Sequence, residues 1–249
     1  MFSPFDLPED IFLLITDELP SPADFALCHC LVSHIKEKQN SSLRVVLSVS
    51  ESLTRWQSIL AKSNVNLSQQ IAAKTFHFID ITSMALVQTD TDTDKLHGNP
   101  FHALYEQISS LLVEGNRDLN PGALVILDDI SSLEWIGFST SDLLRLCRAL
   151  RVLCLKNQAT LIIRHHIVTP GELDPLFQHL HSLCTYHLDI QPLNSGRSGD
   201  VSGQIALHSG PNAFPQSAVK TRQRSAALQY RLTDGTAIFF ERGSSRGVL

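Results

Sequence analysis

The sequence predicts an α/β fold in which a mostly parallel β-sheet is covered by helices on both faces. Up to Pro192, segments with strand-like composition alternate with segments of helical periodicity. Several strand segments are continuously apolar, as expected for strands buried on both faces of a parallel sheet. After Pro192 three strand-like segments follow one another. This change predicts an antiparallel edge with a C-terminal β-hairpin.

The expected strands are apolar or β-branched runs, and the helices between them carry an apolar face. The strands are 11–15, 44–50, 75–81, 123–129, 159–166 and 184–190, followed by SGQIALHS (202–209), SAALQYRL (225–232) and TAIFFERG (236–243), the last two joined by a tight turn at Asp234-Gly235. The helices are 22–38, 52–64, 99–115, one opened by Ser139, and 171–183.

The helix at 99–115 has the clearest signals. Asn99 can cap it, and apolar residues line one face before Gly115 ends it. A second helix start is marked by Ser139 with Asp142 three residues later, which is a capping-box pattern. Both helices lie between predicted strands, as an α/β fold requires.

The chain is expected to form a single domain over residues 1–249. Its 43% hydrophobic content suffices for one large core, and no long linker separates its two halves. The segment 82–98, which includes QTDTDTDKLHG, is the best candidate for a flexible insert.

Composition argues against a membrane protein and favours a chain with protein partners. No apolar run reaches the roughly 18 residues that a transmembrane helix needs, and the N-terminal residues lack the basic region of a signal peptide. The five cysteines lie in apolar segments and fit buried, reduced thiols of an intracellular protein. Charged residues make up only 18% of the chain, which favours burial against partner subunits.

The segment ALVILDDISSLEWIG (123–137) is typical of a strand that ends in a magnesium-holding acid, as in P-loop NTPases. Such a site also needs glycines whose N–H groups cradle phosphates, with a Lys and a Ser or Thr. The turn after the first expected strand, TDELPSPADF (16–25), has no Lys, two prolines and three acids, and the first glycine of the chain is Gly98. Prolines lack the N–H donor, and acids repel phosphate. We therefore expect no bound nucleotide and no other cofactor.

Asp128 and Asp129, at the end of this strand, then have two interpretations. In the first, they accept hydrogen bonds from Ser131, Ser132 or nearby backbone donors. In the second, they are a degenerate Walker B-like strand end that shapes a subunit interface. A magnesium ion there would have too few oxygen ligands without phosphates, so neither interpretation is catalytic.

The histidine-rich segment near residue 180 predicts no metal site. His179, His181, Cys184 and His187 lie within nine residues, but their spacing crosses an expected helix–strand boundary and matches no standard zinc site. We expect scattered structural histidines and no metal.

His165 and His166 end an expected strand beside Arg164. An enzyme using this strand end would need a concave pocket and a histidine with a shifted pKa, and it would lose activity on His166→Ala. The sequence offers no companion nucleophile, which favours a packing or surface role.

Charge is spread unevenly along the chain. Residues 191–249 hold seven Lys and Arg against three acids, whereas residues 1–190 hold 13 against 22. Lys220, Arg222 and Arg224 lie in an acid-free stretch between two expected strands. Phosphate contacts from such a loop would give salt-dependent RNA binding that is largely independent of sequence. The alternative is an ordinary soluble hairpin tip.

The closing residues LQYRLTDGTAIFFERGSSRGVL (228–249) resemble the C-terminus of the family of the sixth Elongator subunit. The shared features are a strand around Tyr230, a tight turn, Phe239-Phe240, Arg242-Gly243 and a Val248-Leu249 ending. SGQIALHS looks like the family's preceding strand, and ALVILDDISSLEWIG looks like its degenerate NTPase strand. Clear similarity covers about 121–140 and 201–249, and the layout agrees over nearly the whole chain.

This resemblance implies a RecA-like fold that has lost its phosphate loop, a pseudo-ATPase and not an enzyme. It also implies a heterohexameric ring of Elongator subunits 4, 5 and 6, two copies of each, which binds tRNA. That ring supports the larger Elongator subunits, which modify the wobble uridine (U34) of tRNA, in the cytoplasm and the nucleus. No catalytic residue carries over.

Two surfaces fit that role. Phe239 and Phe240 alternate across a strand, so one should face the core and the other a neighbouring element or subunit, unless both are covered within this chain. Lys220, Arg222 and Arg224 are the candidates for RNA contact. The alternative to an Elongator subunit is a recombinase-paralogue-like DNA repair scaffold without nucleotide, and a preference for tRNA over single-stranded DNA would separate the two.

Overall fold

The computed structural model describes residues 4–83, 100–119, 121–193, 201–214, 218–234 and 236–242. Within these residues nine strands form one sheet in the order β3-β2-β4-β5-β1-β6-β7-β8-β9. The strands are β1 (Phe12–Glu18), β2 (Arg44–Ser48), β3 (Phe76–Asp80), β4 (Ala123–Leu127), β5 (Ala159–Ile167), β6 (Tyr186–Gln191), β7 (Gly203–Ser209), β8 (Leu228–Leu232) and β9 (Ala237–Phe240). β1 to β6 run parallel and β6 to β9 pair antiparallel, which confirms the predicted class.

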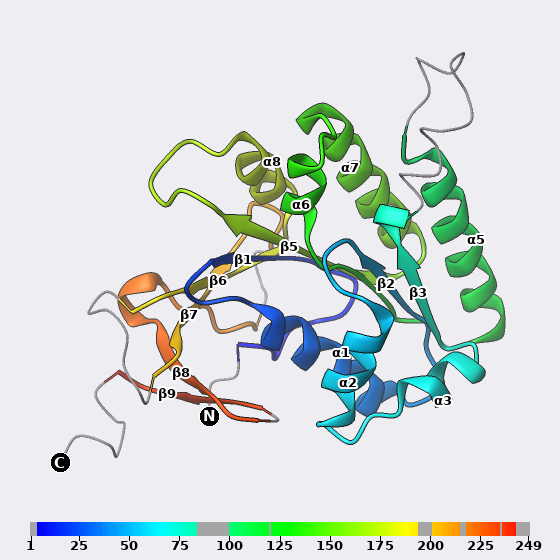
Figure 1. Cartoon of the computed structure of the whole chain (residues 1–249), viewed down its shortest axis with the longest axis horizontal. Helices are drawn as coiled ribbons and strands as arrows, with labels where there is room; N and C mark the ends of the chain where they lie inside the picture. Colours follow the sequence, from blue (N-terminus) through cyan, green and yellow to red (C-terminus); the bar gives the residue numbers. More distant parts are fainter. Residues whose placement is uncertain are drawn as a thin grey trace.

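Helices cover both faces of the parallel part of the sheet (Figure 1). They are α1 (Asp24–Lys38), α2 (Leu53–Ala61), α3 (Leu67–Ala72), α5 (His102–Asp118), α6 (Ile130–Trp135), α7 (Thr140–Lys156) and α8 (Pro175–Leu183). The described residues form two hydrophobic cores, one on each face of the sheet. Alternate residues of β1 contribute to each core, because successive side chains of a strand point to opposite faces. Phe12 and Leu14 pack with α5 to α8, whereas Leu13 and Ile15 pack with α1 to α3.

The first strand is longer than the predicted 11–15. That expected end rested on the change from apolar to polar residues, yet β1 continues to Glu18 and pairs with β5 throughout. Asp17 lies opposite His166 in this register. The polar residues at the end of β1 are therefore held by strand pairing at the carboxyl edge of the sheet.

Helix α5 does not end at Gly115, as the sequence predicted, but continues to Asp118. A Cβ atom at position 115 would lie 2.8 Å from Leu43 Cδ2, so the glycine allows α5 to approach the residue before β2. The helices α3 and α6 were missed because their six residues each are too few to show a helical period.

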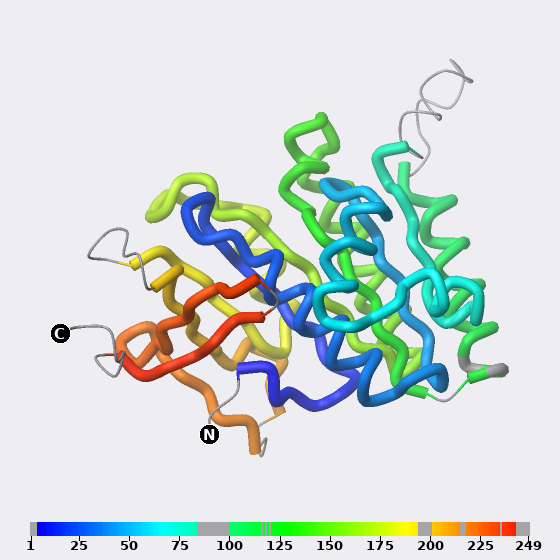
Figure 2. The backbone as a smooth tube through the Cα atoms, turned by 60° about the horizontal axis from the view of Figure 1, so that its bottom comes forward, coloured from blue at the N-terminus to red at the C-terminus, as the bar shows by residue number. Residues whose placement is uncertain are grey.

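The C-terminal strands β7 to β9 extend the sheet past β6. Figure 2 shows the β8–β9 hairpin lying beside the N-terminal segment, and the ring centroids of Phe5 and Phe239 are 5.7 Å apart. Of the predicted features, the insert beyond residue 83, Gly235 and the closing residues from Gly243 onward lie outside the described residues.

Gly210→Ala should lower the free energy of unfolding by about 1–3 kcal/mol, the usual cost of overpacking. A Cβ atom there would overlap the backbone carbonyl of Cys184 and lie 2.6 Å from its Sγ. Urea denaturation of this variant and of Ser209→Ala, at the exposed neighbouring residue, measures the effect. Ser209→Ala should stay within about 0.5 kcal/mol of the wild type, and an equally stable Gly210→Ala would contradict the packing described.

Candidate functional site

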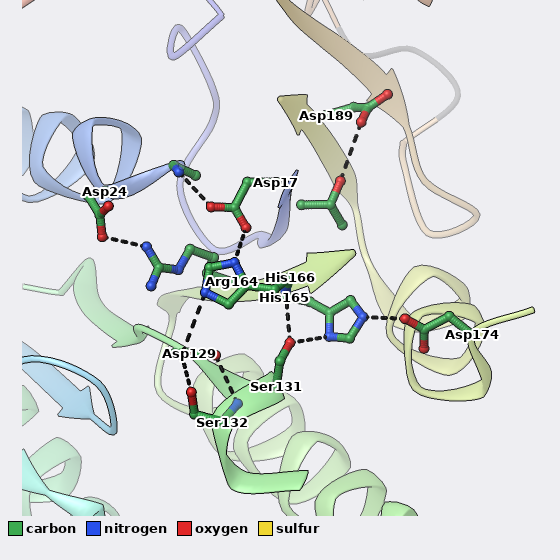
Figure 3. Close-up of polar contacts among 12 residues, drawn as sticks. Asp17, Asp24, Asp129, Ser131, Ser132, Arg164, His165, His166, Asp174 and Asp189 are labelled. Carbon is green, nitrogen blue, oxygen red and sulfur yellow. Dashed lines mark hydrogen bonds and ion pairs between the residues drawn. The ribbon is translucent and has the colours of Figure 1, made fainter. Parts of the chain in front are cut away.

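The carboxyl ends of β1, β4 and β5 bring charged side chains together at one edge of the sheet (Figure 3). Asp17 comes from β1, Asp129 follows β4, and Arg164, His165 and His166 come from β5. Ligands of open α/β sheets bind at this edge, outside the carboxyl ends of the strands. The contacts among these side chains therefore decide what the edge can bind.

The start of α1 is occupied by a side chain of the chain itself. The backbone N–H of Ala23, the residue before α1, donates a hydrogen bond to Asp17 Oδ2 at 2.6 Å. A helix N-terminus favours an anion, because its first N–H groups are unpaired and the helix dipole is positive there. Asp17 is 1% exposed, so its carboxylate supplies that anion from inside the fold.

His166 lies between two carboxylates. Its Nδ1 is 2.5 Å from Asp17 Oδ1, and its Nε2 is 3.6 Å from Asp129 Oδ2. Burial alone would lower the pKa of His166, but the contacts with Asp129 and Asp17 outweigh it and raise the pKa to about 9. The ring also stacks on Trp135, with centroids 6.3 Å apart. The protonated imidazole thus places a positive charge between the ends of β1 and β4.

Asp128 and Asp129 have different partners. Asp129 caps α6 by accepting hydrogen bonds from the Ser132 N–H, at 3.0 Å, and from the Ser132 hydroxyl. Asp128 accepts from the Val49 N–H, at 2.8 Å, and from the Ser48 hydroxyl. Burial raises the pKa of Asp128 to about 6 although both hydrogen bonds oppose the rise. The interpretation of these acids as hydrogen-bond acceptors thus holds for Asp129, whose donor is Ser132. Asp128 accepts from residues at the end of β2 and not from Ser131.

Arg164 forms an ion pair with the first residue of α1. Its Nη1 is 2.6 Å from Asp24 Oδ1. Arg164 and Asp128 line a small cavity under α1 and α2, with room for roughly one water molecule. The space between this strand edge and α1 is therefore largely filled by side chains.

Ser131 and His165, both buried, and the half-buried Asp174 form a chain of hydrogen bonds. Ser131 Oγ is 2.9 Å from His165 Nδ1, and His165 Nε2 is 2.7 Å from Asp174 Oδ2. The order resembles a catalytic triad, but Ser131 and His165 are each 2% exposed, and Ser131 Oγ also accepts the His166 N–H. Asp174 also caps α8 through the Phe177 N–H. This row of hydrogen bonds therefore joins α6, β5 and α8. The Ser131 hydroxyl is buried and cannot be reached by a substrate.

The catalytic hypothesis for His165 and His166 required a concave pocket and a shifted pKa. The shift is present in His166. Neither of the two cavities described at this edge has His165 or His166 in its walls. Both histidines are instead engaged by carboxylates, which supports a structural role.

The three predicted RNA-binding residues lie between β7 and β8, as expected from the sequence. Arg222 donates to both carboxylate oxygens of Glu241, at 2.9 and 2.7 Å. Arg224 Nε donates to Asp189 Oδ2 at 2.5 Å. Lys220 is exposed and has no hydrogen bond or ion pair within the described residues. RNA contact by these three residues stays a prediction. Of the three, Lys220 is the one whose charge is not paired with a carboxylate in the described residues.

Phe239 and Phe240 are both half-buried and face opposite sides of β9. Phe239 packs within the chain, since its ring lies close to those of Phe5 and Tyr230. Phe240 shares its face with Ile238, which is 45% exposed. A subunit contact through Phe240 stays a prediction.

Sequence reasoning recognised Asp17 and Asp24 only as acids that would repel phosphate. It missed Arg164 as the partner of Asp24 and Ser48 as a donor to Asp128. One signal was available for Arg164, because a charged residue inside an apolar strand has to be paired once it is buried.

The chain matches the protein family described as Elongation complex protein 6 over residues 2–234. It belongs to this family. Membership makes the chain a non-catalytic Elongator subunit, as the resemblance of its closing residues implied. No relative was found among curated proteins. In the described part of the chain, none of the helices combines the length and apolar character needed to cross a bilayer.

Among solved structures, the chain is similar to a KaiC-like protein, PH0186, from the archaeon Pyrococcus horikoshii OT3. The TM-score is 0.64 and the sequence identity is 10%, with 94% of this chain and 91% of the other covered. At this identity the likeness concerns the fold alone, and it confirms the predicted RecA-like class.

The stability of the chain should fall between pH 6.5 and about 9 because of His166. Its pKa is raised in the folded state from 6.5 to about 9, so its contribution is complete below pH 6.5 and is lost as the imidazolium deprotonates. We expect a loss of about 1–2 kcal/mol after allowance for partial solvent exposure.

Urea denaturation over this range, for the wild type, His166→Gln and the exposed control His102→Gln, checks this expectation. His166→Gln should remove that part of the pH dependence, and His102→Gln should keep it. An unchanged pH dependence in His166→Gln would rule out the ion pairs described for this residue.

Proposed function

We propose that this chain forms a heterohexameric RecA-like ring with Elongator subunits 4 and 5, two copies of each. The ring binds tRNA and supports the larger subunits that modify the wobble uridine (U34), in the cytoplasm and the nucleus. The observation that carries this proposal is the family match over residues 2–234. The RecA-like sheet supports a non-catalytic role in this ring. The carboxyl edge of the sheet, where a nucleotide would bind, is occupied by the chain's own Asp17 and His166.

The proposed role of the strand edge is structural. A bound nucleotide would place phosphates at the start of α1, where the Asp17 carboxylate already accepts the Ala23 N–H. Pro20 and Pro22 in the preceding turn cannot donate N–H groups. We infer a pseudo-ATPase subunit without a Walker A loop, with Asp128 and Asp129 as its degenerate Walker B-like strand end.

Apolar surface supports the proposed ring contacts. Trp135 is 62% exposed and Leu173 is 76% exposed, and both lie beyond the carboxyl ends of the parallel strands. Phe240 and Ile238 add apolar surface on β9, the outer strand of the sheet. Exposed apolar residues on the outermost strand of the described sheet favour association with another chain.

Purification of the tagged chain from its native cells at moderate salt, followed by mass spectrometry, tests the assembly. We expect Elongator subunits 4 and 5 in amounts equal to this chain, with the larger subunits at lower yield. Recovery of the chain alone, or with DNA repair proteins, would contradict the proposed ring.

Lys220→Ala should weaken tRNA binding by the purified assembly and reduce the slope of affinity against salt by about one counter-ion. Lys220 is an exposed charge in the predicted RNA-binding tract. Fluorescence anisotropy with labelled tRNA at several salt concentrations measures both quantities. Lys62→Ala, an exposed lysine at the end of α2, serves as the control, and equal behaviour of the two variants would exclude Lys220 from the RNA contact.

A further inference from the structure

A second cavity lies at the carboxyl edge of the sheet, beside the Asp17 cluster. Its volume is about 150 Å³, and its walls come from the ends of β1 and β6, the segment between β5 and α8, and Arg224. A cavity of that size can hold a six-membered ring. The proposed assembly and tRNA contact leave this space without a role.

The charges in its walls are strongly one-sided. Glu18, Glu172, Asp174 and Asp189 contribute four carboxylates, and Arg224 is the one Lys or Arg among the wall residues. The Arg224 guanidinium is bound to Asp189 at 2.5 Å. The electrostatic potential of such a cavity attracts cations and repels phosphates.

Two of these carboxylates have no counter-ion bonded to them. Glu18 and Glu172 make no side-chain hydrogen bond or ion pair within the residues that the structure describes, whereas Asp174 is bonded to His165. Burial, together with the nearby charge of Asp189, raises the pKa of Glu18, although the charge of Arg224 opposes the rise. A cation in the cavity would relieve this unfavourable environment.

The buried His187 lies in the same wall and adds no positive charge to it. Its Nε2 is 2.7 Å from Thr16 Oγ1, and the Thr16 hydroxyl points to Asp189 Oδ1 at 3.5 Å. Burial lowers the pKa of His187 to about 3, so the ring is neutral at physiological pH.

Apolar side chains complete the walls. Ile167, Pro170, Phe177 and Ile190 line the cavity. Alkyl stems of cationic groups pack against such surfaces, and an aromatic face attracts the charge itself. We propose that this cavity binds a guanidinium or ammonium group carried on a short apolar stem.

Two sources share that chemistry. One is an Arg or Lys side chain of a neighbouring subunit, and the other is a free small organic cation. The first would fill the cavity only in the assembly, whereas the second would enter it in either state.

Isothermal titration of the purified full-length chain with n-butylguanidinium tests the site, and n-butylurea serves as the neutral probe of similar shape. We expect saturable binding of the cation, weaker at high salt, and none of the urea. Glu18→Gln and Glu172→Gln should each weaken binding about two- to fivefold, the range of partly exposed ion pairs. Glu37→Gln, on the exposed surface of α1, should bind as the wild type does.

Equal binding of the urea, or no saturable binding of the cation, would overturn the proposal. Unchanged affinity in both cavity variants would do the same. Binding to the isolated chain but not to the purified assembly would assign the cavity to a partner's side chain, and binding to both would assign it to a free cation. The result on the isolated chain is independent of the proposed ring.

Discussion

The buried carboxylate of Asp17 determines how the charged edge of this sheet is organised. It receives the N–H of Ala23 at the start of α1 and faces His166 across the β1–β5 pair. The helix start and the imidazolium are both positive, and Asp17 is the anion between them. Its position depends on β1 remaining paired as far as Glu18. The start of α1 and the charge of His166 thus share this one anion, and Asp129 is the second carboxylate beside His166.

Much of the fold follows from local patterns. The continuously apolar β4 and the helix α7, whose start is marked by the cap at Ser139, can be predicted from their own residues without knowledge of the elements that pack against them. Contacts between distant segments are different. The pairing of Arg164 with Asp24 joins residues 140 positions apart, and it depends on the strand order, which no local pattern encodes. The end of β1 was misjudged for the same reason, because neighbouring strands extended it through polar residues.

The basic tract at Lys220, Arg222 and Arg224 shows why a count of charged residues overstates the positive charge that is available to bind RNA. Residues 191–249 carry a surplus of Lys and Arg, yet Arg222 and Arg224 are bonded to Glu241 and Asp189. Those acids come from β6 and from the residue after β9, so the loop folds back on the sheet. RNA phosphates would have to compete with internal carboxylates for these guanidinium groups, whereas Lys220 has no such carboxylate partner among the residues that the structure describes.

The coupling among Asp17, His166 and Asp129 also bears on the evolution of this strand edge. Replacing Asp17 alone would leave the Ala23 N–H without its acceptor and His166 with the more distant carboxylate of Asp129, and replacing His166 alone would leave two neighbouring carboxylates. Each single step costs stability, because an uncompensated buried charge is strongly unfavourable. Nucleotide binding at this edge would need several substitutions at once, together with a glycine-rich turn. The coupling among these side chains therefore disfavours a stepwise change of this strand edge towards nucleotide binding.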